Sequence, residues 1–126
     1  MKRYLNYKKV ADYLFKGKSF FSIAKNQNRY DECNATTKVQ LERLQALNQL
    51  LNIANYYNSK SECVFEDRFI ILYRDVDDCF TTTKVDMPRY YRRGLEAFFY
   101  RQEDAEEVIN NPNFKEVLNL VYHKID

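Results

Sequence analysis

The spacing of hydrophobic residues between positions 37 and 58 is the strongest pattern in the chain. Five apolar side chains recur there at steps of three and four residues: Leu41, Leu44, Leu47, Leu51 and Ala54. This spacing places them on one face of a helix. Thr37 and Gln40 match a capping box, in which each side chain satisfies a free backbone N–H at the helix start. The pattern predicts a long helix that begins after Asn34 and ends near Asn58.

Three further segments have the apolar spacing or the end signals of helices. Residues 7–15 carry an apolar side, and Gly17 follows, as glycine often does just past a helix. Residues 102–110 begin with carboxylates, which the positive end of a helix dipole favours. Asn111 and Pro112 then match the start of a new helix, in which a capping residue precedes a proline at the first helical position. The apolar stripe expected on this last helix is Phe114, Val117, Leu118, Val121 and Tyr122.

Four stretches are typical of strands. Residues 68–73 (RFIILY) are nearly continuous in apolar residues, which favours a central strand, and residues 80–85 return as a threonine-rich strand after an Asp-rich connection. The aromatic stretches 20–23 and 96–100 are predicted as further strands. We therefore expect an α+β fold in a single domain, residues 1–126. In it, a small antiparallel sheet of three to four strands packs against the long helix and a C-terminal helix pair.

The composition excludes several kinds of site. The 126 residues are 45% hydrophobic and 30% charged, which is a globular mixture. Two glycines and two prolines leave no room for a Gly-rich phosphate loop or a Pro-rich linker. Cys33, Cys63 and Cys79 form no Cys-x-x-Cys pair, so neither a zinc site nor a disulfide framework is indicated. Lone thiols, no recognisable signal peptide and no apolar run of about 20 residues predict a cytoplasmic protein without a membrane partner.

Charged residues alternate in blocks along the chain. Residues 1–30 hold eight basic residues and one acidic residue, and residues 89–101 hold four and one, whereas residues 31–88 and 102–126 are net acidic. One interpretation is that the blocks neutralise each other in the folded domain. The other is a basic face for an anionic partner.

Both basic blocks mix basic and aromatic residues, which suggests a binding surface. Arginine pairs bidentately with phosphate, and tyrosine rings stack on unpaired bases. The candidate residues for binding a partner or nucleic acid are Lys8, Lys9, Arg89, Tyr90, Tyr91, Arg92 and Arg93. The alternative is that the tyrosines pack under the sheet edge and the arginines pair with acidic segments. A pI of about 8.4 is low for a non-specific nucleic-acid binder, which favours this alternative.

The sequence contains no recognisable catalytic or metal-binding motif. Asp75–Asp78 offers clustered oxygens, but the glycine and distant glutamate of a calcium loop are missing, so a hairpin turn is expected. The carboxylates of residues 103–107 are explained by the helix dipole. His123 is the single histidine, and no nucleophile motif accompanies it or the cysteines. The sequence predicts a protein that is not an enzyme and takes no cofactor or metal.

Several segments also fit one shared pattern. They are LNQLLNIANYYN (47–58), which ends in Ala54 and Asn58, then the strand RFIILYRD (68–75) with Tyr73, and AFFYRQEDAEEVI (97–109). Together they resemble a group of small uncharacterised proteins of tailed phages and prophages of gut bacteria. The opening YKKVADYLFKGKSFF (7–21) is similar to the start of longer members. A Trp-Pro loop common in that group is replaced here by SKSECVFED (59–67).

The resemblance implies an accessory protein of a mobile genetic element, expressed inside a bacterial host. The function we expect is non-enzymatic binding of a macromolecule, a host or phage protein, as an inhibitor of a host defence complex or as a small assembly factor. The alternative is a nucleic-acid-binding module that uses the basic and aromatic residues named above.

Overall fold

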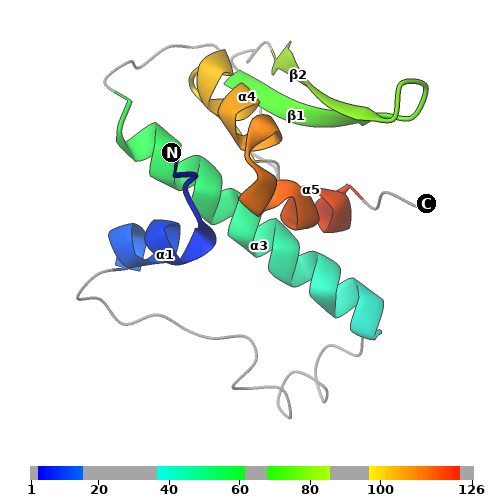
Figure 1. Ribbon diagram of the computed structural model, residues 1–126, viewed down its shortest axis with the longest axis horizontal. Helices are drawn as coiled ribbons and strands as arrows, with labels where there is room; N and C mark the ends of the chain where they lie inside the picture. Colours follow the sequence, from blue (N-terminus) through cyan, green and yellow to red (C-terminus); the bar gives the residue numbers. More distant parts are fainter. Residues whose placement is uncertain (1–2, 16–36, 62–67, 86–96, 123–126) are drawn as a thin grey trace, which may run out of the picture.

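A computed structural model describes residues 3–15, 37–61, 68–85 and 97–122, and this part of the chain is α+β (Figure 1). Its elements are α1 (Tyr7–Phe15), α3 (Lys38–Ser59), β1 (Arg68–Arg74), β2 (Cys79–Val85), α4 (Gln102–Asn110), the 3₁₀ turn η2 (Pro112–Phe114) and α5 (Lys115–Val121). The predicted bounds of α1 and α4 are confirmed at both ends. Those of β1 and β2 are confirmed to within one residue. The predicted strand at 20–23 and the glycine stop at Gly17 lie outside the described residues.

Local capping signals set the ends of two helical segments. The Thr37 side chain accepts a hydrogen bond from the backbone N–H of Gln40 (3.1 Å), which confirms that half of the predicted capping box. Asn111 accepts from the N–H of Asn113 (2.9 Å), with Pro112 at the first helical position. The predicted last helix therefore starts as η2, which runs directly into α5.

The sheet in the described residues is smaller than predicted. β1 and β2 pair antiparallel from Arg68↔Val85 to Arg74↔Cys79. On the other side of β1, Phe69 and Phe99 form an isolated bridge through backbone hydrogen bonds of 2.9 and 2.8 Å. This part of the chain thus has two strands and a one-residue bridge, and the prediction of three to four strands exceeds what it contains.

An asparagine side chain occupies the outer edge of residues 97–100. Asn58 donates to the carbonyl oxygen of Phe98 (2.7 Å) and accepts from the N–H of Tyr100 (3.0 Å). Because Phe99 turns its own N–H and C=O toward β1, these neighbouring groups face away from β1, and the amide binds them where a further strand would pair. Because α4 begins at Gln102, the chain turns away from the sheet directly after this point.

The helix pair α4–α5 separates the hairpin from the long helix (Figure 1). α4 packs on both strands, and Gln102 of α4 donates to the Thr82 hydroxyl (3.2 Å). α3 packs mainly on α5 and α1. The expected packing of sheet on long helix therefore runs largely through α4 and α5. Of the described helices, none has the length and apolar character needed to cross a membrane.

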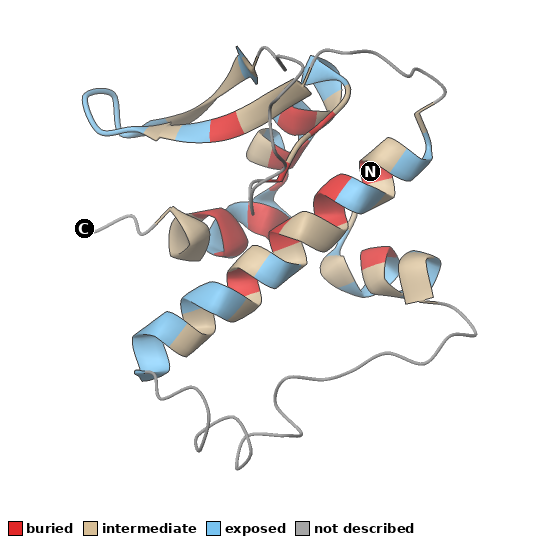
Figure 2. Cartoon of the chain, turned by 180° about the vertical axis from the view of Figure 1, so that it is seen from behind, coloured by how far each residue is buried: buried red, intermediate tan, exposed pale blue. Residues whose placement is uncertain are grey.

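The core lies where α3, α4, α5 and β1 approach one another (Figure 2). The largest fully buried side chains are Phe99, Phe114, Leu50, Ile53, Ile71, Leu118, Val10 and Val108. On α3 the buried row is Ala46, Leu50, Ile53, Ala54 and Tyr57. The row named from the sequence lies beside this one: Ala54 belongs to both, Leu51 is partly buried against the core, and Leu44 is exposed. Two adjacent apolar rows share one helical period, and the period does not decide which of them faces the core.

Candidate functional site

Three leucines of α3 line an open groove beside the core. Leu44 and Leu47 form one wall, next to the buried Leu50, and the segment Ile70–Leu72 of β1 forms the other. Ala97 and the end of α5 complete the lining. The volume is about 650 Å³, within the range usual for ligand sites. We refer to this feature as the apolar groove.

The apolar groove remains accessible to water and has one charged side chain in its lining. Leu44 and Leu72 keep 44% and 40% of their surface exposed. Arg43 lines the groove with Gln40, and its Nε donates to the carbonyl oxygen of Val121 (3.2 Å). This bond places a cation at the C-terminal end of α5, where the helix dipole favours it. The groove therefore combines exposed apolar surface with a guanidinium group.

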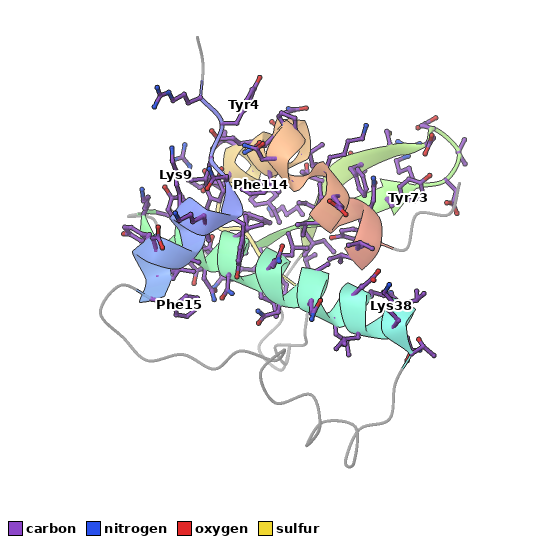
Figure 3. All side chains as sticks on the ribbon, turned by 60° about the horizontal axis from the view of Figure 1, so that its bottom comes forward. Tyr4, Lys9, Phe15, Lys38, Tyr73 and Phe114 are labelled. Atoms are coloured by element: carbon purple, nitrogen blue, oxygen red, sulfur yellow. The ribbon has the colours of Figure 1, made fainter. Side chains whose placement is uncertain are left out.

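A second pocket of about 500 Å³ lies where the N-terminal segment, the end of α3 and the start of α4 meet. It brings together four basic and two acidic side chains, and we call it the charged pocket. Its lining is Arg3, Leu5, Lys9, Tyr56, Tyr57, Lys60, Ser61, Arg101, Asp104 and Glu107. In Figure 3, Tyr4 and Lys9 lie at the opposite end of the molecule from Tyr73 and Lys38. The charged pocket is therefore remote from the end of α3 that borders the apolar groove.

The pKa values of three ionisable groups around the charged pocket are shifted by burial, by neighbouring charges or by a hydrogen bond. Burial, together with the Glu107 carboxylate, raises the pKa of the Tyr57 phenol far above its usual value. Burial also raises the pKa of Asp104, and the Arg101 guanidinium opposes that shift in part. A hydrogen bond to the Tyr56 hydroxyl raises the pKa of Lys60. At neutral pH the lysine is charged and the phenol of Tyr57 is neutral.

The structure places only part of the predicted basic–aromatic surface. Lys8 and Lys9 are both exposed on α1, and Lys9 lines the charged pocket whereas Lys8 does not. The other predicted residues lie outside the described ranges: Arg89, Tyr90, Tyr91, Arg92 and Arg93. The sequence did not single out Lys60 or Arg101 as partners of Lys9. No local motif could do so, because tertiary packing alone brings these residues together.

Some of the acidic residues, and one of the cysteines, that were considered as catalytic or metal ligands lie in the described residues. Asp75–Asp78 forms an exposed hairpin turn, in which Asp77 pairs with Arg74 at 3.0 Å. Within the described ranges no group of three or more metal-binding side chains occurs. Cys79 is exposed, while Cys33, Cys63 and His123 fall outside these ranges. On α4, Asp104 and Glu107 line the charged pocket in addition to lying near the helix start.

Comparison with known proteins gives no family for this chain. No protein-family model matches it, and no match is found among curated proteins or solved structures. The apolar groove and the charged pocket are therefore the features of this protein that bear on its function.

Proposed function

We propose that this protein works by binding a partner protein in the apolar groove and does not catalyse a reaction. The observation that carries the proposal is the exposure of Leu44 and Leu72 on facing walls of a groove of about 650 Å³. Apolar surface that remains in water at a concave site is typical of interaction sites, because a bound partner removes it from water.

The partner surface that fits best is an amphipathic helix. The α3 wall presents Gln40, Leu44, Leu47 and Leu50, a row at helical spacing that extends along about 15 Å of the helix. A groove of this length holds about three turns of a partner helix, whose apolar face would meet the leucines. Arg43 favours an acidic residue on that partner, because its remaining guanidinium N–H groups can donate to a carboxylate.

The biological setting that we propose follows from the resemblance to phage and prophage proteins. In that setting the protein acts in the cytoplasm of a bacterial host and occupies a host or phage protein. Inhibition of a host defence complex and service as a small assembly factor are both consistent with binding through a groove.

A matched pair of variants tests the apolar groove. The full-length chain is used to capture proteins from a bacterial lysate, and bound proteins are identified by mass spectrometry. Leu44→Lys charges the groove at a side chain that is 44% exposed, so we expect the variant to fold. Val76→Lys makes a similar change at a 91% exposed residue of the hairpin turn, outside the groove. We expect Leu44→Lys to abolish capture of the partner and Val76→Lys to leave it intact. Equal capture by both variants would contradict the proposal.

The second candidate function is nucleic-acid binding. It is favoured by the convergence of Arg3, Lys9 and Lys60 with tyrosine rings at the charged pocket. A gel-shift assay with single-stranded DNA at two salt concentrations tests it, since binding through phosphates must weaken steeply as salt increases. Absence of a shift at low salt would exclude this function.

A further inference from the structure

The N-terminal wall of the charged pocket is held in place by side-chain hydrogen bonds. The buried Asn111 amide donates to the carbonyl oxygen of Leu5 (2.9 Å), and Asn52 of α3 donates to the Tyr7 hydroxyl (2.8 Å). These bonds attach the N-terminal segment to the corner between α4 and η2, and the first turn of α1 to α3. The backbone that carries the two basic side chains of this wall is therefore fixed against the other walls.

Three of the four basic side chains of the pocket lie on other walls than its two carboxylates, whereas the fourth, Arg101, stands at the start of α4 and pairs with Glu103 (3.1 Å). Arg3 and Lys9 belong to the N-terminal wall and Lys60 to the end of α3, whereas Asp104 and Glu107 belong to α4. Among the described residues, no carboxylate forms an ion pair with any of these three basic side chains. Arg3, Lys9 and Lys60 are therefore not neutralised by the carboxylates of the pocket and can bind an anion.

The ammonium group of Lys60 is oriented by aromatic rings. Its Nζ donates to the Tyr56 hydroxyl (2.8 Å) and lies 4.3 Å from the centroid of that ring. The Tyr13 ring centroid is 4.8 Å away. Cation–π attraction and the hydrogen bond both favour the charged form and restrict the side chain. Because an ammonium has three N–H groups, donors remain for a ligand.

The α4 wall has the chemistry that binds hydroxyl groups. Asp104 is half-buried there, and Glu107 lies one turn further along the same face. Carboxylates only accept hydrogen bonds, so they repel an anion and bind groups that donate. Sugar hydroxyls are such donors, and acidic side chains bind ribose in this way in dinucleotide-binding folds.

We infer that the charged pocket binds a sugar that carries a phosphate monoester, as in a nucleotide. The phosphate lies toward Arg3, Lys9 and Lys60, and the sugar hydroxyls lie toward Asp104 and Glu107. A phosphate monoester carries a charge of about −1.5 to −2 at neutral pH, which suits three cationic groups. A free nucleotide and the 5′-phosphorylated end of an RNA both present a phosphate monoester on a ribose that keeps its 2′-hydroxyl. The inference deepens the second candidate function, but free nucleotide binding does not require that function.

Calorimetric titration of the full-length protein with adenosine 5′-monophosphate at low salt tests the pocket. Lys9→Gln removes a pocket cation, and Lys8→Gln removes the neighbouring exposed lysine that does not line the pocket. The two variants have the same net charge, so long-range attraction changes equally in both. We expect Lys9→Gln to weaken binding by about fivefold or more and Lys8→Gln to change it by less than about twofold. Equal weakening by both variants, or no binding by the unaltered chain, would overturn the inference.

Two further comparisons separate the ligand groups and the sources of the phosphate. Adenosine without phosphate should bind at least about tenfold more weakly than the monophosphate, because it lacks the charged hydrogen bonds. Short RNA with a 5′-phosphate should bind more tightly than the same RNA without it if nucleic-acid ends are the source. Binding of RNA regardless of its 5′-phosphate, with none of the monophosphate, would overturn the inference while leaving nucleic-acid binding in place. Binding of the monophosphate alone supports the inference and excludes the second candidate function.

Discussion

At the scale of single residues, asparagine side chains join distant parts of the chain. Asn52 connects α3 to α1, Asn58 connects α3 to the residues beside the bridge, and Asn111 connects the α4–η2 corner to the N-terminal segment. An amide both donates and accepts, so one side chain can satisfy two backbone groups. The sequence gives no sign of these bonds, because asparagine in a helix end or turn is equally typical of local capping.

Replacement of Asn58 by alanine should destabilise the fold strongly. The change leaves the Phe98 carbonyl and the Tyr100 N–H without their partner in a half-buried place. Unsatisfied buried groups of this kind cost about 1–3 kcal/mol each, so we expect a loss of about 2–4 kcal/mol in unfolding free energy. Urea denaturation measures it. Asn55→Ala on the exposed side of the same helix is the control, and it should change stability by less than about 0.5 kcal/mol.

The raised pKa of Tyr57 predicts a loss of stability at alkaline pH. Above about pH 10 the unfolded chain releases the phenol proton, while the folded chain retains it because burial and Glu107 disfavour the phenolate. The contribution of Tyr57 to the unfolding free energy is therefore fully present below pH 10. It decreases above pH 10, by at most about 1.4 kcal/mol per pH unit. Tyr57→Phe has no phenol proton to release. In urea denaturation, its unfolding free energy relative to that of the unaltered chain should rise between pH 9 and 11. If the unfolding free energies of the two chains changed in parallel with pH, the raised pKa of Tyr57 would be contradicted.

At the scale of elements, helix bounds were predictable and strand number was not. The caps at Thr37 and Asn111 involve residues that are close in the sequence, so the sequence alone indicates where they lie. Strand pairing depends on partners far along the chain. The aromatic residues 97–100 have the composition of a strand, but only Phe99 pairs with β1, and α4 starts at Gln102. The groove and the charged pocket were beyond prediction for the same reason, because both are made by tertiary contacts.

Removal of the Thr37 cap should loosen the start of α3 without unfolding the core. The first turn of α3 is exposed, and its Val39 keeps 60% of its surface in water. Thr37→Ala should therefore lower the unfolding free energy by about 1 kcal/mol or less and speed amide exchange at residues 38–42. Thr37→Ser retains the hydroxyl and should restore slow exchange. A loss well above about 2 kcal/mol would show that this turn is packed against other parts of the chain.

At the scale of the whole molecule, the attachment of the N-terminal segment depends on few contacts. Val10 is the single buried residue of α1. The Asn52–Tyr7 hydrogen bond attaches α1 to α3, and the amides of Asn111 and Asn113 donate to the carbonyl oxygens of Leu5 and Tyr4 at the α4–η2 corner. A nine-residue helix is marginal in water by itself, so α1 must rely on these contacts. α3, α4 and α5 bury more apolar residues among themselves, and they should open less readily.

This difference predicts that α1 opens first when the Asn111 contact is removed. Asn111→Ser keeps a capping oxygen for η2 but loses the amide bond to the Leu5 carbonyl, which then keeps only the longer bond from Asn113 (3.1 Å). Hydrogen exchange should then accelerate more at the amides of α1 than at those of α5. Asn110→Ser changes the exposed neighbouring asparagine and should leave both helices protected. Equal acceleration in α1 and α5 would mean that the N-terminal segment unfolds only together with the core. In that case the wall of the charged pocket would be as stable as the core itself.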